Sequence, residues 1–342
     1  KNEMSQEYAI SLVPKRYASR IKRLQVLKQA VSLGYISETN HDETFRGTWP
    51  FKPYFFNGNG FKQHYIDEGP KDGFPIIMLH GEPTWGYIYR NFIPQLSEKY
   101  RVIVPDLMGF GKSETPQDKE YTLKTHVENL ARLIDFLDLK NITFVGQDWG
   151  GPITGAYSIR NIDRVKGYVL INTLFGYSKE ERPKGLTPWF KWIKKHHEAN
   201  TLEGILGELG STVLSVMKIP NFTNNNIIND NWINAYSSQF PDRASCIGAI
   251  NFPLDALLNR IVPFIVEGIK QGNLSELCSK PAILAYGMQD KAIDPNYAIR
   301  DFKALFPNSS VTKIPNAGHY SQEDEPQILI DLIEKFMSEN SK

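Results

Sequence analysis

Short apolar segments alternate with longer amphipathic segments from residue 50 onward, and this alternation constrains the fold more than any other feature of the sequence. Apolar runs typical of buried strands lie at 62–67, 75–79, 100–104, 142–145, 167–171, 282–286 and 310–314. Apolar residues at helical spacing lie at 123–139, 152–160, 297–305 and 326–337. Strands that alternate with helices form a mostly parallel sheet covered on both faces, so we predict an α/β fold. Ligands bind such sheets beyond the carboxyl ends of the strands, where reactive side chains are therefore expected.

A long, predominantly helical segment interrupts the alternation between two strands of the same sheet. Its helical patterns cover 187–197, 202–216, 231–236 and 254–270. A helical insertion of this kind can roof a pocket, so we interpret residues 176–273 as a helical cap. The core then consists of residues 46–175 and 274–342. The cap contains three tryptophans, Trp189, Trp192 and Trp232.

Residues 1–45 differ from the rest of the chain in their charge. Between Glu7 and Glu38 there is no acidic residue, and apolar residues at helical spacing predict a helix over 14–34. We interpret this basic amphipathic helical extension as packing on the main body, with docking on anionic lipid or a partner as the alternative. Because the chain begins at Lys1, a removed targeting peptide stays open. We expect a cytoplasmic protein, with a periplasmic or secreted location as alternatives.

The composition excludes several classes of partner and site. Lysine plus arginine total 39 and aspartate plus glutamate total 38, so the net charge of +1 argues against nucleic acid as the main partner. The two cysteines, Cys246 and Cys278, are too few and too widely spaced for a disulfide framework or a cysteine-rich zinc site. No apolar stretch reaches the ~18 residues that a membrane-spanning helix needs. We therefore expect a soluble protein of enzyme size.

The pentapeptide GQDWG (146–150) follows a predicted strand and precedes a predicted helix. A small residue on each side of a central residue is typical of the sharp strand-to-helix turn that carries the nucleophile of α/β-hydrolases. Most of these enzymes have serine at the centre, whereas this chain has Asp148. A carboxylate attacks carbon directly and forms an alkyl ester with the enzyme, so it does not cleave esters or peptides as serine does. The alternative is that Asp148 only caps the following helix.

A carboxylate nucleophile of this kind needs a histidine and a second acid. His319 follows the last predicted strand, where this fold places its histidine, and we assign a structural role to His80, the rival beside a strand end. Asp290 directly follows a predicted strand, with Asp294 as a second candidate. The end of the previous strand offers Asn172, which cannot stabilise an imidazolium by charge. The nucleophile, the acid and the histidine then occur in the chain order expected for this fold.

Two backbone N–H groups are candidates for an oxyanion hole, that of Glu82 in the loop after strand 75–79 and that of Trp149. The indole N–H of Trp149 can only donate, so it suits a departing halide; the alternative is a tryptophan that fills space under the cap. Position 82 could supply a second donor if it held asparagine, because an ionised glutamate has no proton to donate. We therefore assign the second donor to the cap and choose Trp189 over the other two cap tryptophans.

Three motifs, HGEPTW (80–85), PDLMGFGKS (105–113) and GQDWGG (146–151), resemble those of the haloalkane dehalogenases, which have the α/β-hydrolase fold. The resemblance runs from near residue 50 to the end of the chain. It points to the branch with a tryptophan pair at the halide and an aspartate acid after the later strand. It extends into the cap, where Phe252 and Pro253 are the expected walls of the substrate pocket.

The resemblance implies hydrolysis of a haloalkane to an alcohol and a halide ion through an alkyl ester on Asp148. His319, oriented by Asp290, would deprotonate the water that attacks this ester, and Trp149 with Trp189 would hold the halide. The implied partners are a small halogenated organic substrate, water and halide. No metal and no organic cofactor is implied.

Related enzymes on the same scaffold are alternatives. Epoxide hydrolases share the aspartate nucleophile but need a tyrosine pair in the cap, where Tyr236 is the obvious candidate. A β-lactone decarboxylase uses related machinery, although its relatives carry asparagine where Glu82 stands. A haloacid dehalogenase would have arginines beside the nucleophile, and WGG (149–151) supplies none. The non-enzyme alternative is a ligand-binding receptor on a hydrolase frame, which usually lacks a triad member.

Overall fold

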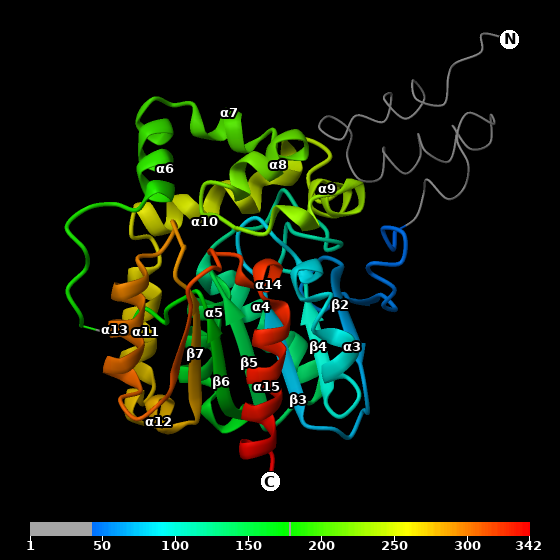
Figure 1. The fold of residues 1–342 in the computed structure, drawn as a ribbon, viewed down its shortest axis with the longest axis vertical. Coiled ribbons are helices and arrows are strands. Elements are labelled where there is room, and N and C mark those ends of the chain that lie inside the picture. Colours follow the sequence, from blue (N-terminus) through cyan, green and yellow to red (C-terminus); the bar gives the residue numbers. More distant parts are fainter. Residues whose placement is uncertain (1–42, 178) are drawn as a thin grey trace, which may run out of the picture.

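The structure is a computed structural model that describes residues 43–177 and 179–342. The predicted helix at 14–34 lies outside the described residues, as does most of the predicted extension at 1–45. Within the described part, a sheet forms the centre and helices surround it (Figure 1).

The central sheet has eight strands in the described part of the chain, which confirms the predicted α/β fold. They are β1 (Tyr54–Phe56), β2 (Gln63–Glu68), β3 (Pro75–Leu79), β4 (Arg101–Pro105), β5 (Ile142–Gln147), β6 (Val165–Ile171), β7 (Ala282–Gly287) and β8 (Val311–Ile314). Their order is β1-β2-β4-β3-β5-β6-β7-β8. The β1–β2 and β2–β4 pairs are antiparallel, and every other pair is parallel. The sequence pattern missed β1, which has only three residues.

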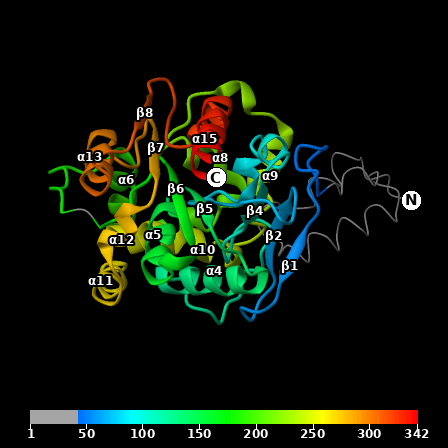
Figure 2. The ribbon, with the colours of Figure 1, turned by 90° about the horizontal axis from the view of Figure 1, so that it is seen from below.

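Helices cover both faces of the sheet. The core helices are α3 (Ile93–Leu96), α4 (Leu123–Leu137), α5 (Gly150–Arg160), α13 (Pro295–Leu305), α14 (Ser321–Asp324) and α15 (Pro326–Asn340). Helix α15 and its neighbour α3 lie on one face, and α4 and α5 lie on the other (Figure 2). The central strands β3 and β5 are consequently buried along their whole length, which is why they appear as continuous apolar runs.

The insertion between β6 and β7 is helical, as the sequence pattern predicts. Its helices are α6 (Pro188–Glu198), α7 (Leu202–Leu206), α8 (Leu209–Met217), α9 (Asp230–Ser237), α10 (Ile247–Leu257), α11 (Val262–Gln271) and α12 (Leu274–Ser279). Helices α6 to α10 lie beyond one end of the strands, whereas α11 and α12 pack beside the sheet against α5 (Figure 1). The domain boundaries at 176 and 273 stay a prediction.

Two cap helices that we predicted as continuous are each divided into two helices in the structure, so this part of the prediction is wrong. The single helix predicted at 202–216 is divided between α7 and α8, and the one predicted at 254–270 is divided between α10 and α11. At the second break Asn259 has a φ of +54°, and Pro263 stands in the first turn of α11. An asparagine with a positive φ typically ends a helix, and a proline in the first turn typically begins one. Among the described residues no single helix is long and apolar enough to cross a membrane; Ala244–Leu257 and Val262–Gln271 pass that test only as a pair bent by 74°.

Candidate active site

The turn between β5 and α5 places Asp148 at the carboxyl end of the central strand. Asp148 has a φ of +54°, a backbone conformation that costs energy for a residue other than glycine. The flanking glycines are required by space: a Cβ on Gly146 would lie 2.7 Å from the Gly150 carbonyl oxygen. A Cβ on Gly150 would lie 2.6 Å from the Leu79 carbonyl oxygen in β3. The close approach of three backbone segments therefore fixes the position of the Asp148 side chain.

The structure brings Asp148, His319 and Asp290 together in one hydrogen-bonded line. His319 Nε2 lies 2.9 Å from Asp148 Oδ1, and His319 Nδ1 lies 2.9 Å from Asp290 Oδ2. All three residues follow the carboxyl ends of their strands, and the imidazole is almost fully buried. This is the geometry in which a histidine can exchange a proton at one nitrogen while a carboxylate orients the other. Asp294 instead caps α13 by accepting the Tyr297 N–H.

Asp290 is held by residues that the sequence pattern did not identify. Its Oδ1 accepts the backbone N–H groups of Ala292 and Ile293, at 2.7 and 3.0 Å. Its Oδ2 accepts the Tyr286 hydroxyl and the Asn172 side-chain amide, both at 3.0 Å. Asn172 is therefore not the acid of the site but lies beside Asp290 and orients its carboxylate. The only sequence signal for this role of Asn172 was its place as a polar residue at the end of β6.

The two carboxylates set the charge of the imidazole. Burial alone lowers the pKa of His319, but the charge of Asp290 and the hydrogen bonds to both carboxylates outweigh it and raise the pKa to about 10. The resting site therefore favours a protonated imidazole between two anions. A change in the charge of Asp148 would shift the protonation of His319.

The candidate oxyanion hole lies on the other side of the Asp148 carboxylate. The Glu82 backbone N–H donates to Asp148 Oδ2 at 2.8 Å. Trp149 immediately precedes α5, and N–H groups at the start of a helix have no carbonyl partner four residues earlier. Gly81 permits this approach, because an added Cβ would collide with the Asp148 carboxylate. Position 81 therefore requires glycine.

The predicted halide-binding tryptophans have different neighbours. The Trp149 indole stacks on Phe252 of α10, with ring centroids 4.6 Å apart and 14° between the planes. Trp189, in the first turn of α6, stacks on Trp192 at 5.6 Å. Within the described residues these two predicted halide donors make no ring contact with each other, although α6 packs against α10. The Nε1 of Trp232 already donates to Glu323 at 3.1 Å, so this cap tryptophan has no free donor for a halide.

The Glu82 side chain differs from the sequence-based expectation of an ionised carboxylate. The residue is 5% exposed, and neither carboxyl oxygen has a hydrogen-bond partner among the described residues. Burial, followed by the charge of Asp148, raises the pKa of Glu82 well above its ordinary value. Burial and the absence of a donor favour the neutral acid at this position, whereas the sequence argument took an ionised side chain.

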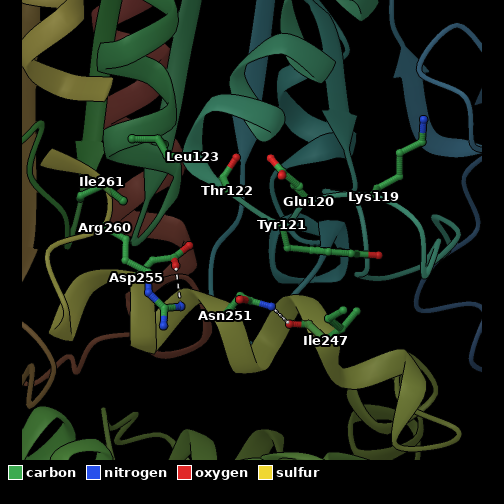
Figure 3. A pocket seen from close by; sticks show the side chains of 10 residues that line it. All are labelled: Lys119, Glu120, Tyr121, Thr122, Leu123, Ile247, Asn251, Asp255, Arg260 and Ile261. Carbon is green, nitrogen blue, oxygen red and sulfur yellow. Dashed lines mark hydrogen bonds and ion pairs between the residues drawn. The ribbon is translucent and has the colours of Figure 1, made fainter. Parts of the chain in front are cut away.

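A cavity of about 400 Å³ lies between helix α10 and the segment that leads into α4, rather than at Asp148 (Figure 3). Asn251 and Asp255 line it from α10, and Tyr121 lines it from the segment that leads into α4. Since Phe252 on the same helix stacks on Trp149, α10 separates this cavity from the nucleophile. Pro253, the other expected pocket wall, is buried in α10. In the part of the chain that the structure describes, no group of His, Cys, Asp and Glu residues is arranged to hold a metal ion.

Comparison with known proteins agrees with this fold. The chain belongs to the α/β-hydrolase family, because residues 75–326 match the family model described as alpha/beta hydrolase fold. The similarity to haloalkane dehalogenases is confirmed: the chain is 31% identical to haloalkane dehalogenase 2 of Mycobacterium tuberculosis, over 84% of this chain and 96% of the relative.

Two further comparisons define the range of relatives. The chain is 32% identical to a cis-3-alkyl-4-alkyloxetan-2-one decarboxylase of Shewanella oneidensis, over 85% of this chain and 89% of the relative. Its fold matches that of haloalkane dehalogenase DpaA from Paraglaciecola agarilytica NO2 with a TM-score of 0.67 and 28% identity, over 83% of this chain and 92% of the other. The relatives therefore include enzymes named for carbon–halogen chemistry and for oxetanone decarboxylation.

Proposed function

We propose that this protein is a hydrolase that acts on carbon–halogen bonds and converts a haloalkane and water to an alcohol, a halide ion and a proton. The observation that carries the proposal is a carboxylate, Asp148, at the nucleophile turn, with a histidine at one oxygen and the Glu82 N–H at the other. The names of the relatives among haloalkane dehalogenases support the substrate class.

In the first step Asp148 Oδ1 attacks the carbon that carries the halogen. The new C–O bond forms as the carbon–halogen bond breaks, and the halide leaves with the electron pair. The other oxygen, Oδ2, becomes the ester carbonyl and keeps its hydrogen bond from the Glu82 N–H. We assign the departing halide to the indole N–H groups of Trp149 and Trp189, which can only donate.

The second step depends on a change in the charge around His319. Two of the causes that raise its pKa are the hydrogen bond to Asp148 and the charge of Asp148. Formation of the ester removes that negative charge, so the pKa of His319 falls, the imidazolium releases its proton to solvent and the neutral imidazole becomes available as a base. It then deprotonates a water molecule that attacks the ester carbonyl carbon. The oxyanion is held by the Glu82 and Trp149 N–H groups. Its collapse expels the alkoxide, which takes the proton of the newly formed carboxyl group, so the alcohol leaves and the Asp148 carboxylate is regenerated.

The insertion would act as the roof of this site. We propose residues 176–273 as a cap on a core of 46–175 and 274–342, with Phe252 and Pro253 as walls between cap and nucleophile. The stacking of Phe252 on Trp149 supports this role, because it joins a cap helix directly to the residue beside the nucleophile.

A single turnover in water enriched in ¹⁸O tests the covalent mechanism. One oxygen of the label should enter the Asp148 carboxylate, which mass spectrometry of the peptide detects. Asp148→Asn should abolish halide release, and His319→Ala should accumulate the ester. Asp294→Asn is the matched control, since asparagine caps a helix as well as aspartate does. Label found in the alcohol alone would refute the ester.

A β-lactone decarboxylase is the second candidate, because one relative at 32% identity carries that kind of name. Measuring halide release and carbon dioxide release from matched haloalkane and oxetanone substrates separates the two. An epoxide hydrolase is less well supported. The buried Tyr236 hydroxyl donates to Glu323 Oε1 at 2.7 Å and so is already engaged rather than free to protonate an epoxide oxygen.

A further inference from the structure

The loop between α8 and α9 of the insertion lies on the two loops that carry the acid and the histidine of the site. The Pro220 carbonyl accepts the Lys291 N–H at 2.8 Å, and the Asn221 side-chain amide donates to the Gln289 carbonyl at 3.0 Å. These two contacts lie on either side of the acid in the chain. The Asn221 carbonyl also accepts the backbone N–H of His319, at 2.8 Å. The α8–α9 loop therefore contacts both loops that serve the nucleophile.

The side chain of Asp324, the last residue of α14, joins the α8–α9 loop to the histidine loop. Its Oδ1 accepts the backbone N–H groups of Thr223 and Asn224, at 2.8 and 2.7 Å. Its Oδ2 accepts the Gly318 N–H at 2.7 Å. Bonds this short are typical of N–H groups that donate to a carboxylate. The two loops are also in close contact, because a Cβ on Gly318 would lie 2.5 Å from the Asn221 carbonyl oxygen.

The backbone of His319 is held from two sides. Its N–H donates to the Asn221 carbonyl, and its carbonyl accepts the side-chain amide of Gln147 at 3.1 Å. Gln147 ends β5 and directly precedes the nucleophile Asp148. The central strand therefore supports one side of the histidine backbone, and the insertion supports the other. A histidine that loses one of these supports can move away from the geometry that proton transfer requires.

The α8–α9 loop has further contacts that hold it in one conformation. Asn221 has a φ of +98°, a value that asparagine adopts more readily than most residues other than glycine. Lys218 Nζ donates to the Phe222 carbonyl at 2.7 Å, and its charge interacts with that of Asp324. The loop is thus a shaped support for the histidine loop rather than a simple connection between two helices.

We propose that Asp324 is a positioning residue for the second step of the reaction, because it holds the α8–α9 loop on the histidine loop and so keeps His319 aligned with the nucleophile. Asp324 acts through the backbone of these loops and not through contact with the substrate. The inference rests on the proposed function, and it gives the insertion a part in aligning the base. Ester formation uses Asp148 as the nucleophile, whereas ester hydrolysis uses His319 as the base. Loss of Asp324 should therefore slow hydrolysis more than ester formation.

Rapid quenching followed by mass spectrometry measures the formation and the decay of the Asp148 ester during one turnover of a haloalkane. Asp324→Ala should leave the rate constant of formation within about threefold and lower that of decay about ten- to a hundredfold, the cost of a misplacement of about 1 Å. Asp324→Asn keeps one acceptor oxygen and should have a smaller effect. Asp242→Ala is the matched control, since Asp242 also accepts a backbone N–H, that of Ser245 at 2.9 Å, in a turn of the insertion.

The proton NMR signal of His319 Nδ1–H gives a second measurement that needs no turnover. The hydrogen bond to Asp290 places this signal at low field, and His319→Ala identifies it by its loss. The signal should move upfield or broaden by exchange in Asp324→Ala and stay unchanged in Asp242→Ala. An unchanged signal in Asp324→Ala would contradict the proposal.

The kinetic results separate positioning from a general loss of structure. A partly unfolded variant lowers the amount of ester formed without changing either rate constant, and this result, or an equal fall in both rate constants, would refute the positioning role. If the unaltered protein forms no ester with any haloalkane, the proposed function fails and the NMR signal alone decides the alignment of His319. If the ester forms and both Asp324 variants hydrolyse it at the normal rate, only the positioning role fails.

Discussion

The buried carboxylate of Glu323 joins the cap to the core. Arg90 donates to both of its oxygens, at 2.6 and 2.8 Å, from the segment after β3. Trp232 Nε1 and the Tyr236 hydroxyl donate to it from α9, at 3.1 and 2.7 Å. Glu323 lies in α14, the short helix that follows His319. Removing this carboxylate should therefore weaken both the attachment of α9 and the position of the histidine loop.

The size of the effect follows from burial. The Glu323 side chain is fully buried and the Arg90 side chain is 11% exposed, so solvent screens the pair weakly. Glu323→Leu leaves a buried guanidinium without its ionic partner, which costs about 3–5 kcal/mol of unfolding free energy. Arg90→Met should cost a similar amount for the same reason. The double variant should cost less than the sum, because neither charge is then left alone.

Urea unfolding monitored by far-ultraviolet circular dichroism measures these values. Glu198→Leu is the control, since its pair with Lys194 at 3.9 Å is mostly exposed and should contribute less than about 1 kcal/mol. In the Glu323→Leu protein kcat should also fall, as the loop that carries His319 loses its anchor. A loss of stability below about 1 kcal/mol, or strict additivity in the double variant, would refute the role assigned to this cluster.

Four further changes test the site. Asp290→Asn should lower the pKa of His319 and slow ester hydrolysis by about 10²–10⁴-fold, so mass spectrometry should detect accumulated ester. An unchanged turnover rate without accumulated ester would contradict the assignment. Phe252→Ala removes the ring stacked on Trp149 and should cost about 3–5 kcal/mol in urea unfolding; an unchanged midpoint would contradict it. Gly150→Ala places a Cβ 2.6 Å from a carbonyl oxygen of β3 and should lower kcat while near-ultraviolet circular dichroism still shows a folded protein; full activity would contradict the close approach. The pKa of His319 is raised from 6.5 to about 10, so its contribution to stability is complete below pH 6.5 and is lost as the pH rises through 10. The difference in urea midpoint between the unaltered protein and His319→Ala should therefore shrink between pH 6 and pH 10. A constant difference would contradict this.

The sequence could predict the sheet and the meeting of the site residues for physical reasons. Buried parallel strands are continuous apolar runs, and their carboxyl ends meet at one edge of the sheet. Residues that directly follow such strands, as Asp148 and Asp290 do, must therefore lie near one another. The turn at Asp148 could be predicted because it is so crowded that the two flanking positions must be glycine, and this requirement leaves a recognisable pattern in the sequence.

The breaks in the cap helices and the surroundings of Asp290 could not be predicted in the same way. Apolar spacing continues across residues 207–208 and 258–261, so a periodic pattern joins helices that the backbone separates. Asn259 and Pro263 were the available signals for the second break. The hydrogen bonds from Tyr286 and Asn172 to Asp290 depend on the pairing of β6 with β7, which no local pattern contains.

The charge state of a buried carboxyl group is the property that the sequence predicts least well, because it depends on which hydrogen-bond donors surround the group in the fold. Glu323 accepts hydrogen bonds from Arg90, Trp232 and Tyr236, and Asp290 accepts them from a hydroxyl, an amide, two backbone N–H groups and the imidazole. Both carboxyl groups are thus fully supplied with hydrogen-bond donors although they are buried. Glu82 is equally buried, has no such donors and faces Asp148, so the same chemical group favours its proton. A buried acid that lies near the nucleophile and lacks a donor is then better suited to give a hydrogen bond than to receive one.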